Sequence, residues 1–110
     1  MKIGDYIMRL SGLAQYSPMF GRGGQGALFP INVFDAPGGA ATLNADVEHK
    51  NLEDTTWSTL GSFTAITTAG LKTLDVSGCK EQLRFKFAIS GAGNVYDTFC
   101  IDVLAPVWKQ

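Results

Sequence analysis

The segment from residue 41 to residue 63, ATLNADVEHKNLEDTTWSTLGSF, carries the most regular pattern in the chain. Side chains alternate there with a period of two, which is the pattern of a β-strand with one buried face and one wet face. One face carries Leu43, Ala45, Val47 and His49, and the other carries Asn44, Asp46, Glu48 and Lys50. Turn-forming residues follow, and apolar side chains then return at Trp57, Leu60 and Phe63. The segment therefore predicts a β-hairpin.

Short apolar segments separated by turn signals continue on both sides of this hairpin. The predicted strands cover residues 2–10, 28–34, 41–50, 56–67, 71–76, 82–90 and 95–104. Pro30 cannot donate a backbone hydrogen bond, so it predicts an edge position for the strand 28–34. A helix over 5–15 is the one helical alternative, which Gly4 and Gly12 weaken. About seven to eight short strands of this kind predict an all-β fold, an antiparallel β-sandwich of jelly-roll-like topology.

The inward faces of these strands predict one hydrophobic core. A chain of 110 residues is long enough for a single core, so residues 1–110 are expected to form one domain. The expected core consists of Val47, Trp57, Phe63, Leu83, Phe85, Phe87, Ile89, Phe99, Ile101 and Val103. Asp97 interrupts the apolar face of the last strand and is expected near the rim.

Residues 11–27 have too much glycine for a regular element and predict a partly extended, Gly-rich N-terminal arm. Apolar side chains on such an arm suit docking onto another subunit, with ordering on assembly. Trp108 in the C-terminal tail suits either an anchor in a partner's pocket or packing on its own sandwich. The predicted partner-binding residues are Tyr16, Met19, Phe20, Arg22, Phe29 and Trp108.

Three glycines of this arm, Gly21, Gly23 and Gly26, match the spacing G-x-G-x-x-G of dinucleotide-binding proteins. That fingerprint requires a strand before it and a helix after it, because the helix N-terminus holds the pyrophosphate. The sequence Ala-Leu-Phe-Pro follows Gly26 and is not a helix start. An extended arm is therefore the preferred interpretation.

Charge and hydropathy argue against two classes of partner. The formal net charge is −1 and the cations are scattered, so the sequence offers no basic stripe for nucleic acid. The longest apolar run is far shorter than the roughly 20 residues that span a membrane. Asp5 and Arg9 interrupt what would be the apolar region of a signal peptide, which argues against secretion.

The chemistry-bearing residues do not form a recognisable catalytic or metal-binding set. His49 is the single histidine, and Asp46 with Glu48 share an exposed strand face, where paired carboxylates are merely solvated neighbours. Calcium could use oxygens of Asp46, Asn51, Glu53 and Asp54, but the spacing matches no dense D-x-D-x-D loop, and Asx-turn geometry explains Asn51 and Asp54 without a metal. We therefore predict no enzymatic activity, no cofactor and no metal.

The chain has two cysteines, which is fewer than a disulfide framework normally has. Free thiols are favoured over a Cys79–Cys100 bridge, which stays open as an alternative. Cys100 is expected as a small buried apolar residue.

The segment 47–63, VEHKNLEDTTWSTLGSF, followed by the strand LRFKF at 83–87, resembles a pattern found in small structural proteins of tailed bacteriophages. The shared form is an alternating strand that ends in Lys-Asn, then E-D-T-x-W, L-G-S-F and a strand of the L-R-F-K-F type. The resemblance covers roughly residues 41–105 and is to the capsid decoration, or cement, proteins of epsilon-fifteen-like podophages.

This resemblance implies a β-sandwich, made in the host cytoplasm, that sits on the capsid exterior of the virion. There it would staple neighbouring major capsid proteins, as a homo-oligomer for which a dimer is favoured over a trimer. The turn D-T-x-W-x-x-L-G is also similar to one in discoidin-like and other carbohydrate-binding sandwiches. The alternative is therefore a carbohydrate-binding module, free or displayed on a virion, that stacks sugar rings on Trp57, Trp108, Tyr6, Tyr16 or Tyr96.

Overall fold

The computed structural model describes residues 2–9, 14–37, 41–91 and 98–110. In these residues the regular structure consists of strands alone, and the predicted all-β antiparallel sandwich is confirmed. The strands are β1 (Lys2–Arg9), β2 (Gln15–Tyr16), β3 (Phe20–Gly21), β4 (Gly26–Asp35), β5 (Thr42–Lys50), β6 (Ser58–Ser62), β7 (Gly70–Ser77), β8 (Gln82–Ser90), β9 (Thr98–Leu104) and β10 (Val107–Lys109). The helix considered over 5–15 is not formed, since β1 and β2 occupy its two ends.

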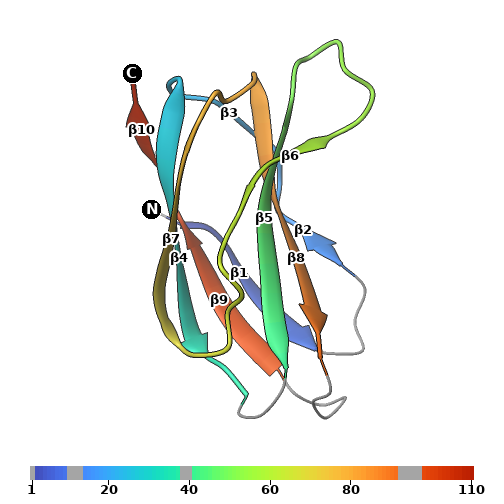
Figure 1. Ribbon diagram of the computed structural model, residues 1–110, viewed down its shortest axis with the longest axis vertical. Coiled ribbons are helices and arrows are strands. Elements are labelled where there is room, and N and C mark those ends of the chain that lie inside the picture. The colour runs from blue at the N-terminus through green and yellow to red at the C-terminus, as the bar shows by residue number, and fades with distance from the viewer. Residues whose placement is uncertain (1, 10–13, 38–40, 92–97) are drawn as a thin grey trace.

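Two five-stranded sheets form the two layers of the sandwich (Figure 1). The first, sheet A, has the order β1-β9-β4-β10, with β7 paired to the other edge of β4. The second, sheet B, has the order β2-β8-β5-β6, and β3 pairs with β8 beyond β2. Every pair is antiparallel. The jelly-roll connectivity stays a prediction.

The predicted hairpin is confirmed by the pairing of β5 with β6, which has a register shift between Val47 and Glu48. The second strand is shorter than expected, because β6 ends at Ser62 and only an isolated bridge, Leu43 to Ile66, continues the pairing. The chain then crosses from sheet B to sheet A and enters β7 at Gly70. Residues 95–97 of the last predicted strand, including Asp97, lie outside the described residues.

The edge position predicted for the strand around Pro30 is wrong, because β4 has partners on both edges. One edge pairs with β7 from Gly26 to Val33. The other pairs with β10 over 26–28 and with β9 over 31–35, so Pro30 falls where one partner gives way to the next. A proline is tolerated there because no ladder bond is required of its missing N–H.

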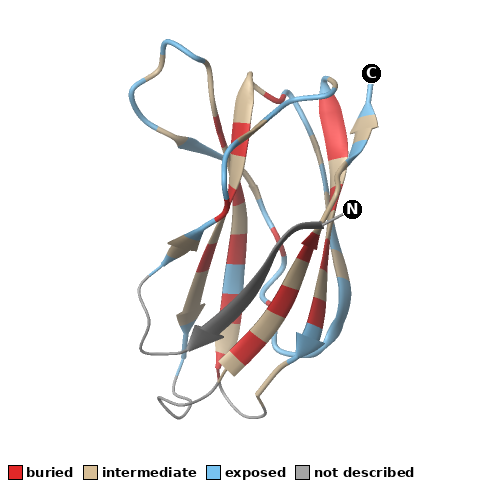
Figure 2. Ribbon diagram, turned by 180° about the vertical axis from the view of Figure 1, so that it is seen from behind, coloured by how far each residue is buried: buried red, intermediate tan, exposed pale blue. Residues whose placement is uncertain are grey.

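The core lies between the sheets, and buried positions alternate with half-buried ones along the strands (Figure 2). Eight predicted core residues are buried: Val47, Phe63, Leu83, Phe85, Phe87, Phe99, Ile101 and Val103. Ile89 is only half-buried, and the prediction for Trp57 is wrong because this half-buried residue lies outside the core beside charged side chains of sheet B. Phe29, Ile31, Val33 and Leu43 are also fully buried, although they were not among the expected core residues.

The predicted arm forms an edge of sheet B over residues 15–21, and its last two residues, Gly26 and Ala27, begin β4 of sheet A. β2 pairs with Phe87 and Lys86, and β3 pairs with Leu83 and Gln82. Between them, buried Ser17 donates its backbone N–H to the Phe85 carbonyl (3.0 Å) and accepts the Phe85 N–H on Oγ (2.8 Å). The expectation that this segment has no fold of its own is therefore wrong.

Candidate docking surface

Three of the predicted partner-binding residues are internal. Phe29 has no exposed surface, and Phe20 and Trp108 pack against the core. Ring centroids lie 6.5 Å apart for Phe20 and Phe29, 6.5 Å for Phe20 and Trp108, and 6.0 Å for Phe29 and Trp108. Trp108 was considered either as an anchor in a partner's pocket or as a residue that packs on its own sandwich. In the structure its ring packs on its own sandwich.

The other three predicted residues lie at the surface and differ in how far their side chains are engaged within the chain. Arg22 donates from a terminal guanidinium nitrogen to the Cys79 carbonyl at 2.7 Å, so its charge fixes the chain internally. Tyr16 is 45% exposed, but the Arg84 guanidinium lies 4.1 Å from its ring centroid. Met19 is 57% exposed and is the most open apolar side chain of this segment.

The outer face of sheet B is polar and contains an ion pair between Arg84 and Glu48. Glu48 and Arg84 are cross-strand partners, and Arg84 Nε donates to Glu48 Oε1 at 2.8 Å. The Arg84 guanidinium also lies 4.4 Å from the centroid of the Trp57 ring, which holds the arginine between Trp57 and Tyr16. Such a face gains little from contact with another apolar surface.

The outer face of sheet A is apolar by comparison. The β4 ladder places Leu28 between Asp75 of β7 and Val107 of β10, and it places Pro30 beside Thr73. Asn32 lies between Leu71 of β7 and Asp102 of β9. We call this surface the sheet A outer face; it consists of Leu28, Pro30, Asn32, Leu71, Thr73, Asp75, Cys100, Asp102, Leu104 and Val107, with Phe34 at its end.

Several large side chains of this face are open to solvent. Leu71 is 63% exposed, Val107 is 58% exposed and Phe34 is 55% exposed. Strand β4 is thus apolar on both sides: Phe29, Ile31 and Val33 fill the core, while Leu28 and Pro30 look outward. A continuous apolar run is typical of a strand that is covered on both faces. The apolar run over residues 27–31 was therefore a signal in the sequence for a strand whose outer face is covered, and it was not used to predict the partner-binding residues.

The charged groups described on this face are mainly carboxylates. Asp75 and Asp102 lie on it and Asp35 lies at its end, where Cys100 is its cross-strand partner. Lys109 forms an ion pair with Asp75 at the margin. A complementary partner would present an apolar centre to this face.

The β5–β6 loop projects beyond the sandwich (Figure 1). Asp54 accepts the backbone N–H of Asn51 on Oδ2 at 2.8 Å, and the Asp54 N–H returns a bond to the Asn51 carbonyl at 3.0 Å. The predicted turn is confirmed, although Asp54 bonds back to Asn51 and does not form an Asx-turn. Leu52 at the tip is 65% exposed. Over the described residues, no three His, Cys, Asp or Glu side chains lie together as a metal site would require.

His49 and Cys79 are titratable groups in poorly solvated positions. His49 is buried, and its Nδ1 accepts the backbone N–H of Lys80 at 3.3 Å. Burial first, and the Lys80 charge second, hold the pKa of His49 below its usual value. Burial raises the pKa of the Cys79 thiol, against a smaller opposing effect of the Arg22 charge.

Both cysteine thiols are free. The expectation that Cys100 is buried is wrong, because Cys100 lies half-buried on the sheet A outer face while Cys79 is the buried one. Cys100 is only half-buried because the strand register places it, like Asp102 two residues later, on the outward side of β9.

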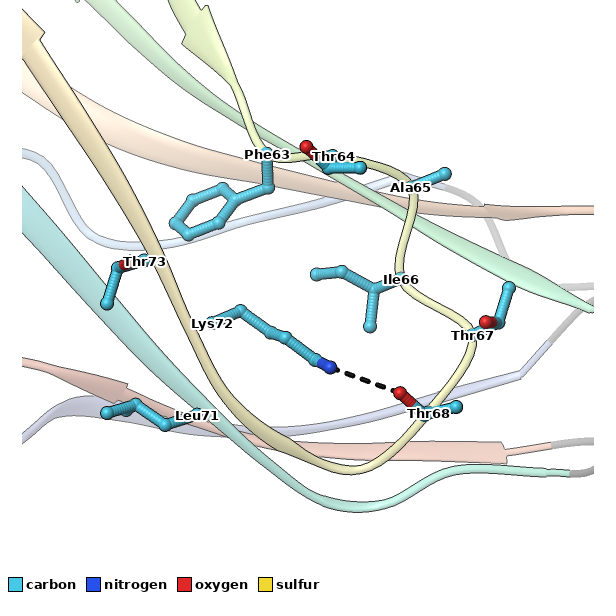
Figure 3. Close-up of a pocket in the computed structure, with 9 residues that line it drawn as sticks. All are labelled: Phe63, Thr64, Ala65, Ile66, Thr67, Thr68, Leu71, Lys72 and Thr73. Carbon is cyan, nitrogen blue, oxygen red and sulfur yellow. Dashed lines mark hydrogen bonds between the residues drawn. The ribbon is translucent and has the colours of Figure 1, made fainter.

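A small open cavity of about 310 Å³ lies between β7 and the segment that leads into it (Figure 3). It is lined by Phe63, Thr64, Ala65, Ile66, Thr67, Thr68, Leu71, Lys72 and Thr73.

No known protein family, curated protein or solved structure matches this chain. In the part of the chain that the structure describes, no helix is long and apolar enough to cross a membrane.

Proposed function

We propose that this protein is a structural protein of a phage virion that docks on the outside of the capsid and staples neighbouring major capsid proteins. The proposal rests on one structural observation, the apolar outer face that sheet A presents over β4, β7, β9 and β10, opposite a polar outer face of sheet B that contains the Arg84–Glu48 ion pair. The sequence resemblance to capsid decoration proteins supplies the class of partner.

The energy available from this face suits a protein that works in many copies. Complete burial of a large apolar side chain contributes about 1.5–3 kcal/mol. Leu71, Val107 and Phe34 are each a little over half exposed, so covering all three contributes roughly 3–5 kcal/mol before the cost of association. One copy then binds weakly, and the capsid lattice multiplies the effect because bridged subunits must separate together.

The carbohydrate-binding alternative draws less support. The rings of Tyr16 and Trp57 lie against the Arg84 guanidinium, and Lys50 Nζ is 5.3 Å from the Trp57 centroid. A sugar would have to compete with these cations for the aromatic faces. Trp108 is engaged with Phe20 and Phe29.

The test is co-sedimentation with purified capsids assembled from the major capsid protein of a tailed phage that carries this protein. Leu71→Ser removes an apolar side chain from the sheet A outer face, and Leu52→Ser removes an equally exposed leucine from the β5–β6 loop. We expect Leu71→Ser to weaken binding about 5- to 30-fold and Leu52→Ser to leave it unchanged. Equal loss in both variants, or in neither, contradicts docking through this face.

Capsid stability tests the stapling itself. Capsids that carry the protein should release their contents at a higher temperature than bare capsids. At a concentration that just saturates the capsids with the unchanged protein, the Leu71→Ser variant should protect them less. Sedimentation velocity of the free protein tests the dimer. Equal thermal stability with and without bound protein would contradict a stapling role and favour glycan binding.

A further inference from the structure

Strand β7 forms an open edge of sheet A. Its residues 70–77 pair with residues 26–33 of β4, and in the described parts of the chain it pairs with no other strand. An open edge presents unpaired backbone N–H and C=O groups, which can form hydrogen bonds with an added strand.

Pro30 determines which residues of β7 present those groups. Thr73 is the ladder partner of Pro30, and a proline without an N–H cannot form the doubly hydrogen-bonded type of antiparallel pair. The backbone groups of Thr73 therefore point away from β4. Since the ladder has no register shift, Leu71 and Asp75 also direct their N–H and C=O groups to the open edge.

The cavity of Figure 3 lies at the N-terminal part of this edge. Phe63 and Ile66, both buried, give it an apolar floor, and threonine side chains line its sides. The segment 63–69 stands off from β7 instead of pairing with it, which leaves about 310 Å³ of open volume beside Leu71–Thr73. That space is available to a polypeptide in extended conformation.

Lys72 supplies a charge to this cavity. Its Nζ points toward Thr68 and donates to Oγ1 at 3.1 Å (Figure 3). The described lining contains no carboxylate, and among the described residues Lys72 forms no ion pair. A cation whose bonded neighbour is a neutral hydroxyl favours an anionic group in the cavity.

We propose that the β7 edge and the cavity together bind one extended segment of a partner protein that carries a carboxylate side chain. The segment adds a strand to sheet A through the backbone of Leu71, Thr73 and Asp75, and its carboxylate pairs with Lys72. This site adjoins the proposed capsid contact, because the side chains of Leu71, Thr73 and Asp75 belong to the sheet A outer face while their backbone groups form the open edge. The peptide titration tests the edge site without capsids, so the site holds whether or not the partner is a capsid protein.

The test is an amide NMR titration of the full chain with two capped hexapeptides, Thr-Val-Thr-Glu-Thr-Val and its analogue with Gln in place of Glu. We expect chemical-shift changes at Leu71, Thr73 and Asp75, with the Gln peptide binding about two- to fivefold more weakly. Shifts elsewhere, or none at millimolar peptide, overturn the proposal. Sodium acetate is the third probe, and shifts at Lys72 with acetate alone would mean a small-anion pocket without strand addition.

Three variants separate the backbone from the charge. Thr73→Pro removes an outward N–H while leaving the β4 ladder intact, and it should abolish binding of both peptides. Lys72→Gln should bind the two peptides equally, and Lys72→Arg should retain the preference for Glu. If Thr73→Pro fails to fold, the two lysine variants still decide the matter, since an unchanged Glu preference in Lys72→Gln overturns the proposal.

Discussion

The contact between Gly23 and Trp108 provides a sharp test of how the N-terminal segment and the C-terminal strand hold each other. A Cβ atom added at Gly23 would lie 2.6 Å from Trp108 Cδ1 and 2.7 Å from its Nε1. Gly23 is not among the described glycines with positive φ, so its backbone accommodates alanine. We predict that Gly23→Ala destabilises the protein through this clash alone.

The magnitudes follow from the two opposing effects of the substitution. Overpacking costs about 1–3 kcal/mol, and the loss of unfolded-state freedom from Gly to Ala returns about 0.4–1 kcal/mol. Gly23→Ala should therefore destabilise by about 1–2 kcal/mol. Trp108→Ala should cost about 2–3 kcal/mol, less than for a fully buried aromatic, because the ring is half-buried against Phe20 and Phe29.

The assay is a double-mutant cycle in which the free energy of unfolding of each variant is measured by urea denaturation monitored with circular dichroism. In the Trp108→Ala background, Gly23→Ala should become neutral or slightly stabilising, which gives a coupling energy of about 1–3 kcal/mol. Gly24→Ala is the matched control, because its Cβ would meet the backbone carbonyl of Lys109, which a side-chain truncation does not remove. Its cost should be the same in both backgrounds.

A Gly23→Ala cost that persists without the Trp108 side chain would refute this reasoning. So would an unchanged stability on Trp108→Ala, since it would mean that the tryptophan contributes nothing to its own fold. In that case the role of Trp108 as an anchor for a partner would have to be taken up again.

Three further predictions concern the core, pH and the thiols. Phe87→Ala should destabilise by about 3–5 kcal/mol, because Phe87 is fully buried and stacks on Phe85 at 5.8 Å; unchanged thermal melting would contradict its place in the core. The pKa of His49 is lowered in the folded protein, so the unfolded chain takes up a proton first as the pH falls below about 6.5. The free energy of unfolding should therefore decline below that pH. Urea unfolding at pH 7.5 and at pH 5.5 should show a smaller decline for His49→Gln. Cys100 should react with a thiol reagent at pH 8 faster than Cys79, because the Cys79 thiol is buried and its pKa is raised. Timed labelling followed by mass spectrometry of peptides measures both rates, and faster labelling of Cys79 would contradict its burial.

Period-two patterning predicted the strands well wherever one face of the strand is apolar and the other polar. Strand 82–90 has the predicted bounds, and its inward residues Leu83, Phe85 and Phe87 are buried. For β4 the strand was predicted over 28–34, but its buried residues were not, because Leu28 and Pro30 are apolar on the outward side as well. Its central position was also missed, because a proline argues against a central strand. Its position depends on the change of partner from β10 to β9, which is a tertiary feature.

The candidate sites were harder to predict because they depend on which strands are neighbours. Glycine content predicted a free arm, whereas its short strands complete sheet B and Gly23 makes room for the Trp108 ring. Trp57 looked like a core residue by type, yet its ring lies against Arg84 on the polar face. The sheet A outer face combines residues of β4, β7, β9 and β10, and only the register brings them together.

Hydroxyl-radical footprinting of the free protein and of the protein bound to capsids tests most directly whether sheet A makes the contact. Oxidation rates of individual side chains report their exposure to solvent, and Phe34, Leu71, Val107, Leu52 and Met19 are all exposed in the free protein. We predict that capsid binding slows the oxidation of Phe34, Leu71 and Val107 severalfold and leaves Leu52 and Met19 unchanged. Protection of Leu52 or Met19, with the sheet A outer face still reactive, would contradict docking through sheet A.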